Sequence, residues 1–365
     1  MVATHALSGV RVLDLATLFP APLLAAMLGD LGADVVKVEP PEGDPLRRVG
    51  PARGSTPVAW TLAGRNKRSV VVDDVLAFAL AAAADVVVVN ESGSRLARRG
   101  WTYDALRDRN PNIVFVSVTA FGATGPYAER PGNGSVVEAF GGFAHLNGEP
   151  EGSPTLPSVA LGDTLTAIAG LNQVLAALYE RDARGAVGGA AGGAGGAFID
   201  VAMYEPILAL LASPIVAWDG ATSPPERSGS RIAGAAPRNV YRCADGGWIA
   251  LSGPTDAQVA RVLVVIGMSA ATDRWGRASQ RVDVEADALD AAVAAWIGAR
   301  PRAAVLDAFL SARIPVAPAN DLADLAADPH VRARGSLDAV RGVQHRRAPE
   351  IGEHTAEVLA DWLGR

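Results

Sequence analysis

Asp163 is a residue whose type and position could do covalent chemistry. It follows Ala-Leu-Gly and directly precedes an apolar stretch, 164–184, whose spacing predicts a long helix. An aspartate with its ordinary pKa of about 3.9 is ionised at neutral pH, and an ionised carboxylate is a competent nucleophile without a general base. Aspartate is also a preferred helix N-cap, and from its spacing alone capping is the simpler interpretation of this residue. In either role the helix N-terminus favours the negative charge, by about 0.3 to 1 kcal/mol.

The turn 17–22 decides whether the chain can hold a dinucleotide. The run 10–16 is strand-like, 21–33 repeats apolar residues at helical spacing and 34–39 is again β-branched, which predicts a βαβ unit. Dinucleotide enzymes carry Gly-x-Gly-x-x-Gly in this turn, whereas this chain has Thr-Leu-Phe-Pro-Ala-Pro, whose bulk keeps the backbone from a pyrophosphate. Glu39 ends the second strand where a ribose-binding acid would lie. Without the glycines, however, a nicotinamide or flavin site is not expected.

Motifs for other common chemistries do not occur in the sequence. Neither a phosphate-binding Gly-x-x-x-x-Gly-Lys-Ser/Thr nor a Gly-x-Ser-x-Gly nucleophile elbow is present. The histidines show no pairing at metal-ligand spacing, so no metal site is expected; they are His5, His145, His330, His345 and His354. The single cysteine, Cys243, excludes an intrachain disulfide framework and fits a reducing compartment.

Composition narrows the class of protein further. With 49% hydrophobic and 20% charged residues, the chain has the composition of a well-buried soluble enzyme. Its net charge of −6 argues against a groove for nucleic acid. No run reaches about 18 uninterrupted apolar residues, and the N-terminus lacks a basic-then-apolar signal pattern. We therefore expect a cytoplasmic protein that does not use a membrane.

The predicted elements form two lobes, as expected for 365 residues. Strands at 69–72, 84–90, 112–118 and 197–202 alternate with helices at 75–83, 94–109, 164–184 and 204–218. This alternation predicts an α/β fold, with a Rossmann-like, doubly wound parallel sheet over residues 1–222. From residue 223 a hairpin at 241–253 and helices at 257–266, 286–299 and 301–313 predict a smaller α+β lobe over 223–329. Residues 330–365 end in a helix and are expected to return to the large lobe.

Several segments, in unbroken order, carry a resemblance to a known family. They are LSGVRVLDLATLFPAPLLAAMLGDLGADVVKVEPPEGDPLR, RNKRSV, ADVVVVN, TYDALRDRNPNIVFVSVTAFGATGPYAERPG, SPTLPSVALGDTLTAIAG and EIGEHTAEVL. In these segments the chain resembles the class III coenzyme A transferases, which include formyl-CoA and carnitine CoA-transferases and have α-methylacyl-CoA racemase as a close relative. The resemblance implies an interlocked homodimer. It also implies acyl-CoA and a free carboxylic acid as substrates, with no permanently bound cofactor.

In that family an aspartate attacks the thioester of an acyl-CoA and gives a mixed anhydride. CoA thiolate opens the anhydride to an enzyme-bound CoA thioester, from which a second carboxylate takes the CoA by the same route. The aspartate of the family motif falls on Asp163. The resemblance thus favours a covalent nucleophile over a cap at this position, and splitting one exchange into two easier steps is what such catalysis offers.

The resemblance also implies contacts with CoA, at Phe19, Pro20, Val72, Asn90 and Arg98. A guanidinium such as that of Arg98 suits a phosphate because its donors form a rigid fork. The basic cluster of Arg65, Lys67 and Arg68 is a second candidate for the 3′-phosphate, with a solvated turn as its alternative. After the asparagine the family usually has Phe-x-Pro-Gly, whereas residues 91–94 here are Glu-Ser-Gly-Ser, which places an acid near an anionic ligand.

Two other functions stay open from the sequence. The related racemase pairs its aspartate with a histidine in a Gly-His-Asp motif, where this chain has Gly-Asn-Gly at 132–134. Asn133 cannot accept a proton at neutral pH, so two-base epimerisation lacks its second base. Glu138 and His145 could substitute in principle, but a solvated helix face and a loop are the simpler interpretations. The third function is a CoA-binding protein without catalysis.

Overall fold

Two compact units make up the chain, as a computed structural model shows. It describes residues 5–54, 56–188, 195–232, 234–281, 285–340 and 346–365. The large unit comprises Met1–Ala144, Leu156–Pro224 and Asp338–Arg365, and the small unit comprises His145–Thr155 and Pro225–Leu337. The sequence placed its boundaries after residues 222 and 329. The segment 145–155 is part of the small unit, to which it is hydrogen-bonded. For example, Arg227 Nη1 donates to the carbonyl oxygen of His145 at 2.9 Å.

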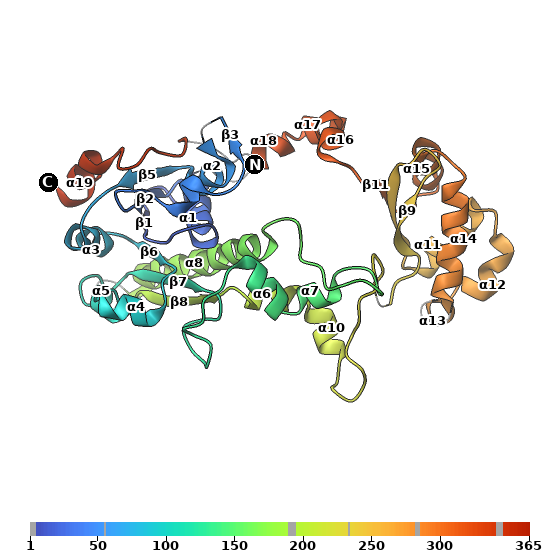
Figure 1. Cartoon of the computed structure of the whole chain (residues 1–365), viewed down its shortest axis with the longest axis horizontal. Helices are drawn as coiled ribbons and strands as arrows, with labels where there is room; N and C mark the ends of the chain where they lie inside the picture. The colour runs from blue at the N-terminus through green and yellow to red at the C-terminus, as the bar shows by residue number, and fades with distance from the viewer. Residues whose placement is uncertain (1–4, 55, 189–194, 233, 282–284, 341–345) are drawn as a thin grey trace. The chain divides into compact units, whose positions relative to one another are not determined.

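A six-stranded parallel sheet is the centre of the large unit (Figure 1), and it confirms the predicted α/β fold. Its order is β5-β2-β1-β6-β7-β8. The strands are β1 (Arg11–Asp14), β2 (Asp34–Val38), β5 (Lys67–Val70), β6 (Val86–Val89), β7 (Val114–Thr119) and β8 (Ala197–Ala202). Counted along the chain, this is the doubly wound order 3-2-1-4-5-6, in which the direction of winding reverses between β1 and β6.

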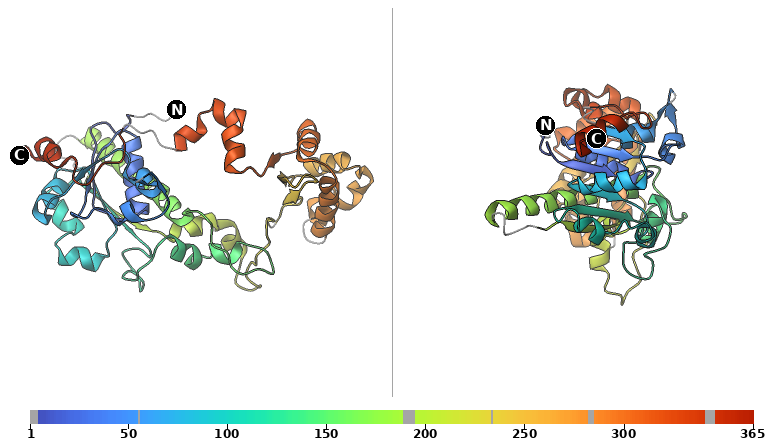
Figure 2. Two further views of the ribbon diagram at one scale, coloured as in Figure 1. Left: turned by 45° about the horizontal axis from the view of Figure 1, so that its top comes forward. Right: turned by 90° about the vertical axis from the view of Figure 1, so that its left-hand side faces the viewer.

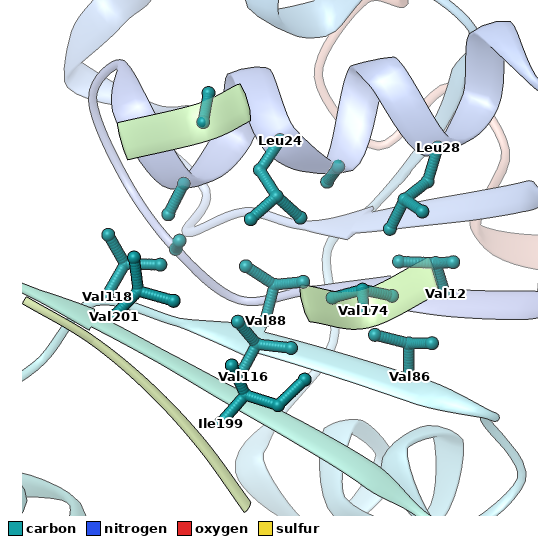
Figure 3. Close-up of a cluster of buried hydrophobic side chains, with 14 of the residues drawn as sticks. Val12, Leu24, Leu28, Val86, Val88, Val116, Val118, Val174, Ile199 and Val201 are labelled. Atoms are coloured by element: carbon teal, nitrogen blue, oxygen red, sulfur yellow. The ribbon is translucent and has the colours of Figure 1, made fainter. Parts of the chain in front are cut away.

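The strands are rich in valine because both faces of the sheet are covered by helices. Side chains alternate between two cores, since successive residues of a strand point to opposite faces. In β6, Val86 and Val88 belong to the first core, shown in Figure 3, whereas Val87 and Val89 belong to the second.

Helices α1 (Pro20–Asp30) and α8 (Leu161–Gly188) cover the first face of the sheet. A proline begins α1, where its missing N–H costs no hydrogen bond. Gly170 of α8 allows close packing against α1, because a Cβ atom there would lie 2.3 Å from a methyl carbon of Leu24. The second face is covered by α3 (Asp74–Ala82), α4 (Gly93–Arg98), α5 (Tyr103–Arg107) and α19 (Thr355–Leu363).

The C-terminal helix α19 packs on the large unit beside β5, and its red ribbon lies next to the blue strands in both views of Figure 2. Val358 and Trp362, one helical turn apart, enter the second core. The backbone N–H of Val71 donates to Thr355 Oγ1 at 3.1 Å, and that of His354 donates to the carbonyl oxygen of Ser69 at 2.9 Å.

The remaining elements of the large unit lie in its connections. They are the hairpin β3 (Ala52–Arg53) and β4 (Thr56–Pro57), the 3-10 turn Pro45–Arg48, and helices α2 (Val58–Gly64), α6 (Gly134–Phe140), α7 (Phe143–Leu146), α9 (Glu205–Leu210) and α10 (Ala212–Ala217). Among the described helices, Leu161–Ala183 of α8 is long and apolar enough to cross a membrane by length and composition alone. A core helix of a soluble protein meets the same criterion.

The small unit has its own core under an antiparallel sheet. The sheet order is β11-β10-β9, from β9 (Arg238–Arg242), β10 (Trp248–Ser252) and β11 (Val316–Pro318). Its helices are α11 (Asp256–Val265), α12 (Thr272–Trp275), α13 (Ala278–Arg281), α14 (Ala286–Gly298), α15 (Arg302–Ser311), α16 (Leu322–Ala327), α17 (Pro329–Ala333) and α18 (Ser336–Val340), the last of which reaches into the large unit. The predicted hairpin is present, with Asp245 Oδ1 accepting a hydrogen bond from the Gly247 N–H at 3.1 Å.

Candidate active site

A pocket of about 840 Å³ opens in the large unit where the parallel strands end. Its walls come from the segments that follow β1 (Thr17 to Pro20), β6 (Asn90 to Ser92) and β7 (Ala120), and from Met203 after β8. In doubly wound sheets, ligands bind at the carboxyl edge where the strand order reverses. The pocket lies at that edge, between β1 and β6.

The turn after β1 is held by one side chain that directly follows β6. Asn90 Oδ1 accepts a hydrogen bond from the Thr17 N–H at 3.0 Å, and its Nδ2 donates to the Thr17 carbonyl oxygen at 2.7 Å. Leu18 follows with a φ of 65°, a left-handed conformation that is strained for a leucine. Its N–H donates to Asp44 Oδ1 at 3.2 Å. The amide of Asn90 is therefore engaged in shaping the wall of the pocket.

A buried group of charges stands behind this turn. Lys37 Nζ lies 3.2 Å from an Asp44 carboxylate oxygen and also donates to the carbonyl oxygen of Ala16. Lys67 Nζ donates to Asp14 at 2.7 Å and to the carbonyl oxygen of Pro22, also at 2.7 Å. Burial lowers the pKa of Lys67 to about 8, although the charge of Asp14 opposes that shift. Each buried charge has a partner, as burial of an ion requires.

The basic cluster of Arg65, Lys67 and Arg68 is not a phosphate site, which corrects that hypothesis. All three side chains are buried, and none lines the pocket. Arg65 forms a bidentate pair with Asp30, at 2.9 and 2.5 Å, and Arg68 pairs with Asp34, Glu357 and Asp361. The guanidinium donors are therefore occupied by carboxylates of the protein itself. Arg68 links β5 to β2 and to α19 in this way.

Asp163 lines the pocket from the first turn of α8. The helix begins at Leu161, so Asp163 lies inside it rather than at the capping position before it. Burial raises the pKa of its carboxyl group, and the charge of Glu138 raises it further, while a hydrogen bond from the backbone of Gly134 opposes both effects. The result is a half-buried carboxylate that is more basic than an ordinary aspartate.

Helix α6 packs directly against this carboxylate. A Cβ atom on Gly134 would lie 2.7 to 2.9 Å from the three carboxyl atoms of Asp163, so only glycine leaves room for this approach. Glu138, one turn later, is buried with 2% exposure, and its Oε1 accepts a hydrogen bond from the Gly162 N–H at 2.8 Å. The interpretation of Glu138 as part of a solvated helix face is therefore wrong. Asn133 caps α6 by accepting from the Val136 N–H at 3.2 Å.

Three arginines, Arg95, Arg98 and Arg130, contribute positive charge to the pocket lining. Within the described ranges, none of them forms an ion pair with a carboxylate, although most other arginines of the large unit do. The guanidinium of Arg130 lies 3.5 Å from the centre of the Tyr127 ring. These arginines suit a ligand that carries several negative charges, although the carboxylates of Glu91 and Glu129 also line the pocket and the charge of Arg98 acts on Glu129.

The structure brings most of the predicted site residues together. Phe19, Pro20, Asn90, Arg98 and Asp163 all line the pocket. Val72 does not line it; this residue follows β5 and packs against the second core. Within the described residues, no group of three or more histidine, cysteine, aspartate or glutamate side chains could hold a metal ion.

Glu138, Gly134 and the Lys37–Asp44 pair support the site but were not predicted from the sequence. A glycine one helical turn before a glutamate is too common a pattern to single out. Their roles depend on contacts with residues about 25 positions away along the chain, such as Gly162 and Asp163.

A doubly wound α/β protein with a basic aspartate in an arginine-containing pocket at the switch point is suited to acyl transfer from an anionic carrier. The sequence profile of CoA-transferase family III matches residues 7–356. The chain belongs to this family and is an acyl-CoA:carboxylate CoA-transferase.

Characterised relatives and a solved structure agree with this assignment. The chain is 35% identical to the succinyl-CoA:L-malate CoA-transferase beta subunit of Chloroflexus aurantiacus, over 99% of this chain and 95% of that protein. It is 32% identical to the succinate:glutarate CoA-transferase of Agrobacterium fabrum, over 97% of this chain and 95% of that protein. A crystal structure of a CaiB/BaiF family protein from Brucella suis superposes with a TM-score of 0.82 at 29% identity, covering 98% of this chain and all of that one.

Proposed function

We propose that this protein moves CoA from a dicarboxylic acyl-CoA such as succinyl-CoA to a free carboxylic acid, through covalent intermediates on Asp163. The observation that carries the proposal is the position of the Asp163 carboxylate in the wall of the pocket at the switch point. The names of the relatives, which act on succinate, malate and glutarate, support a dicarboxylic donor.

The reaction proceeds in two symmetrical halves. An oxygen of Asp163 bonds to the thioester carbonyl carbon, and the C–S bond breaks. CoA leaves as a thiolate, and a mixed anhydride of the donor acid remains on Asp163. The thiolate then attacks the Asp163 carbonyl carbon, which releases the donor acid as a carboxylate and leaves a CoA thioester on Asp163. The acceptor carboxylate repeats these steps in reverse and regenerates Asp163. No net proton is gained or lost, so the aspartate needs no general base.

The pocket supports this sequence with its charges. Phe19 and Pro20 would contact the apolar parts of CoA, while Arg95, Arg98 and Arg130 would neutralise its phosphates or the distal carboxylate of the acyl group. Asn90 would act indirectly, since its amide is hydrogen-bonded to the turn at Thr17.

A homodimer, which the family resemblance implies, is part of the proposal. Apolar side chains of α8 and α10 are exposed to an unusual degree, including Tyr179 at 78% and Val216 at 84%. We propose that a second chain covers these exposed apolar side chains, since large apolar surfaces are typical of protein interfaces.

Intact-mass spectrometry with peptide mapping tests the chemistry directly. The protein is incubated with a mixed panel of acyl-CoA donors, with succinyl-CoA among them, beside Asp163→Ala. We expect an acyl or CoA adduct on the peptide that carries Asp163, and no adduct on the variant. The mass of the adduct identifies the donor. Absence of any adduct with the complete panel would contradict covalent transfer, and α-proton exchange with solvent would then favour a racemase over an inactive CoA-binding protein.

A further inference from the structure

Glu138 is a buried carboxylate that the transfer chemistry does not itself require. It lies in α6 with 2% of its surface exposed, and it does not line the pocket. Its Oε1 accepts a hydrogen bond from the Gly162 N–H at 2.8 Å. Because Gly162 immediately precedes Asp163 in the first turn of α8, this bond fixes the backbone that carries the nucleophile.

Glu138 also acts on Asp163 through its charge. The elements packed against α8 carry other carboxylates, namely Asp30 in α1, Asp200 in β8 and Glu205 in α9. Among the described charged side chains, which include these carboxylates and the arginines of the pocket, only Glu138 shifts the pKa of Asp163, and it raises it. The two carboxylates therefore repel each other across the contact between α6 and α8.

The geometry points to Glu138 as a positioning residue that holds the Asp163 backbone and makes its carboxylate a stronger nucleophile. This inference rests on the proposed function. In the first step, negative charge leaves Asp163 for the substrate, so the repulsion from Glu138 falls on the way to the transition state. An interaction that disfavours the ground state more than the transition state accelerates the chemical step.

In the first step the Asp163 carboxylate must displace the CoA thiolate, and a thiolate is more basic than a carboxylate. The rate of such a step depends on the basicity of the attacking group. Glu138 raises that basicity without touching the substrate, and its own burial reduces the screening of its charge by solvent.

The variant Glu138→Gln separates charge from position. The glutamine carbonyl oxygen can still accept the hydrogen bond from Gly162, so the backbone anchor is retained while the charge is lost. The titration midpoint of Asp163 is followed by carbon NMR of protein labelled at the aspartate carboxyl carbons, with Asp163→Asn to assign the signal. We expect the midpoint to fall in Glu138→Gln, because the repelling charge is lost. We also expect kcat to fall severalfold, with KM for succinyl-CoA within about twofold of wild type.

Glu138→Ala provides the matched comparison, since it removes both the charge and the anchor. Its kcat should fall below that of Glu138→Gln. The Asp163 midpoint should also fall in Glu138→Ala, which tests the interaction even if Glu138→Gln does not fold.

The outcomes distinguish this inference from the proposed function. An unchanged Asp163 midpoint in Glu138→Gln or, if that variant does not fold, in Glu138→Ala would overturn the tuning role. A wild-type kcat in a folded Glu138→Gln would overturn its part in catalysis. If the wild-type protein transfers no CoA but the midpoint still moves, the electrostatic coupling stands and the proposed function fails.

Discussion

Replacement of Gly134 by alanine should misplace the nucleophile while leaving the fold intact. The new Cβ atom would lie 2.7 Å from the nearest Asp163 oxygen, where ordinary contact begins at 3.4 Å. The carboxylate must therefore move by about 0.7 Å, which it can do by rotation. Gly134 has no positive φ and stands at the first position of α6, so alanine is compatible with its backbone.

A displacement of about 1 Å at a reacting group can cost about 100-fold in rate. For Gly134→Ala we expect kcat to fall about 10- to 100-fold, which is a barrier increase of about 1.4 to 2.7 kcal/mol. KM for acyl-CoA should stay within about threefold of wild type, because Gly134 lines the pocket beside Asp163 and the proposed CoA contacts of Phe19 and Arg98 are unchanged.

Steady-state transfer kinetics with the donor identified by mass spectrometry provide the assay, and calorimetric CoA binding checks that the pocket is intact. Gly298→Ala is the control for the glycine-to-alanine change itself. Gly298 ends α14 in the small unit, and a Cβ atom there meets only one neighbour, at 3.8 Å. A kcat for Gly134→Ala within twofold of wild type would refute the idea that contact with α6 sets the position of the carboxylate.

Two further predictions concern stability and CoA affinity. Because the pKa of Asp163 is raised by burial and by Glu138, the folded protein binds more protons than the unfolded chain between pH 3.8 and the raised pKa. The contribution of Asp163 to stability falls as pH rises through this window, so Asp163→Asn should raise the free energy of unfolding at pH 7 by about 1 kcal/mol. Thermal unfolding at pH 7 and pH 4 checks this; a gain that is equal or larger at pH 4 would contradict it. If Arg98 contacts the 3′-phosphate, Arg98→Ala should weaken CoA about tenfold and dephospho-CoA much less, and equal losses in calorimetry would refute that contact.

Much of the large unit could be predicted because its signals are local. Strands β2, β6 and β7 are short valine-rich runs, and apolar spacing identifies α1 and α8 without knowledge of any partner. The same regularity explains why five predicted site residues meet in one pocket. Asn90 directly follows β6, and Phe19 and Pro20 lie where the connection after β1 enters α1. The carboxyl ends of these parallel strands must lie along one edge of the sheet.

The interpretations that were wrong concerned charges whose partners lie far along the chain. Nothing beside Arg68 in the sequence indicates pairing with Asp34 and with α19, nearly 300 residues later. Burial of Glu138 was hidden for a related reason, because it depends on how α6 packs on the first turn of α8. Sequence periodicity indicates which face of an element is apolar, but it does not indicate which buried charged side chains form ion pairs with each other.

Helix α6 determines both the position and the basicity of Asp163. Gly134 and Glu138 are four residues apart and so lie on the same face of this short helix. One removes the steric barrier to close approach, and the other supplies the hydrogen bond and the repelling charge. The capping hydrogen bond of Asn133 fixes where α6 begins and hence the register of both residues. The chain has an asparagine where the related racemase has its second base. In the proposed mechanism that position serves the geometry of one nucleophile, and the repulsion between Glu138 and Asp163 costs stability while it makes Asp163 more basic.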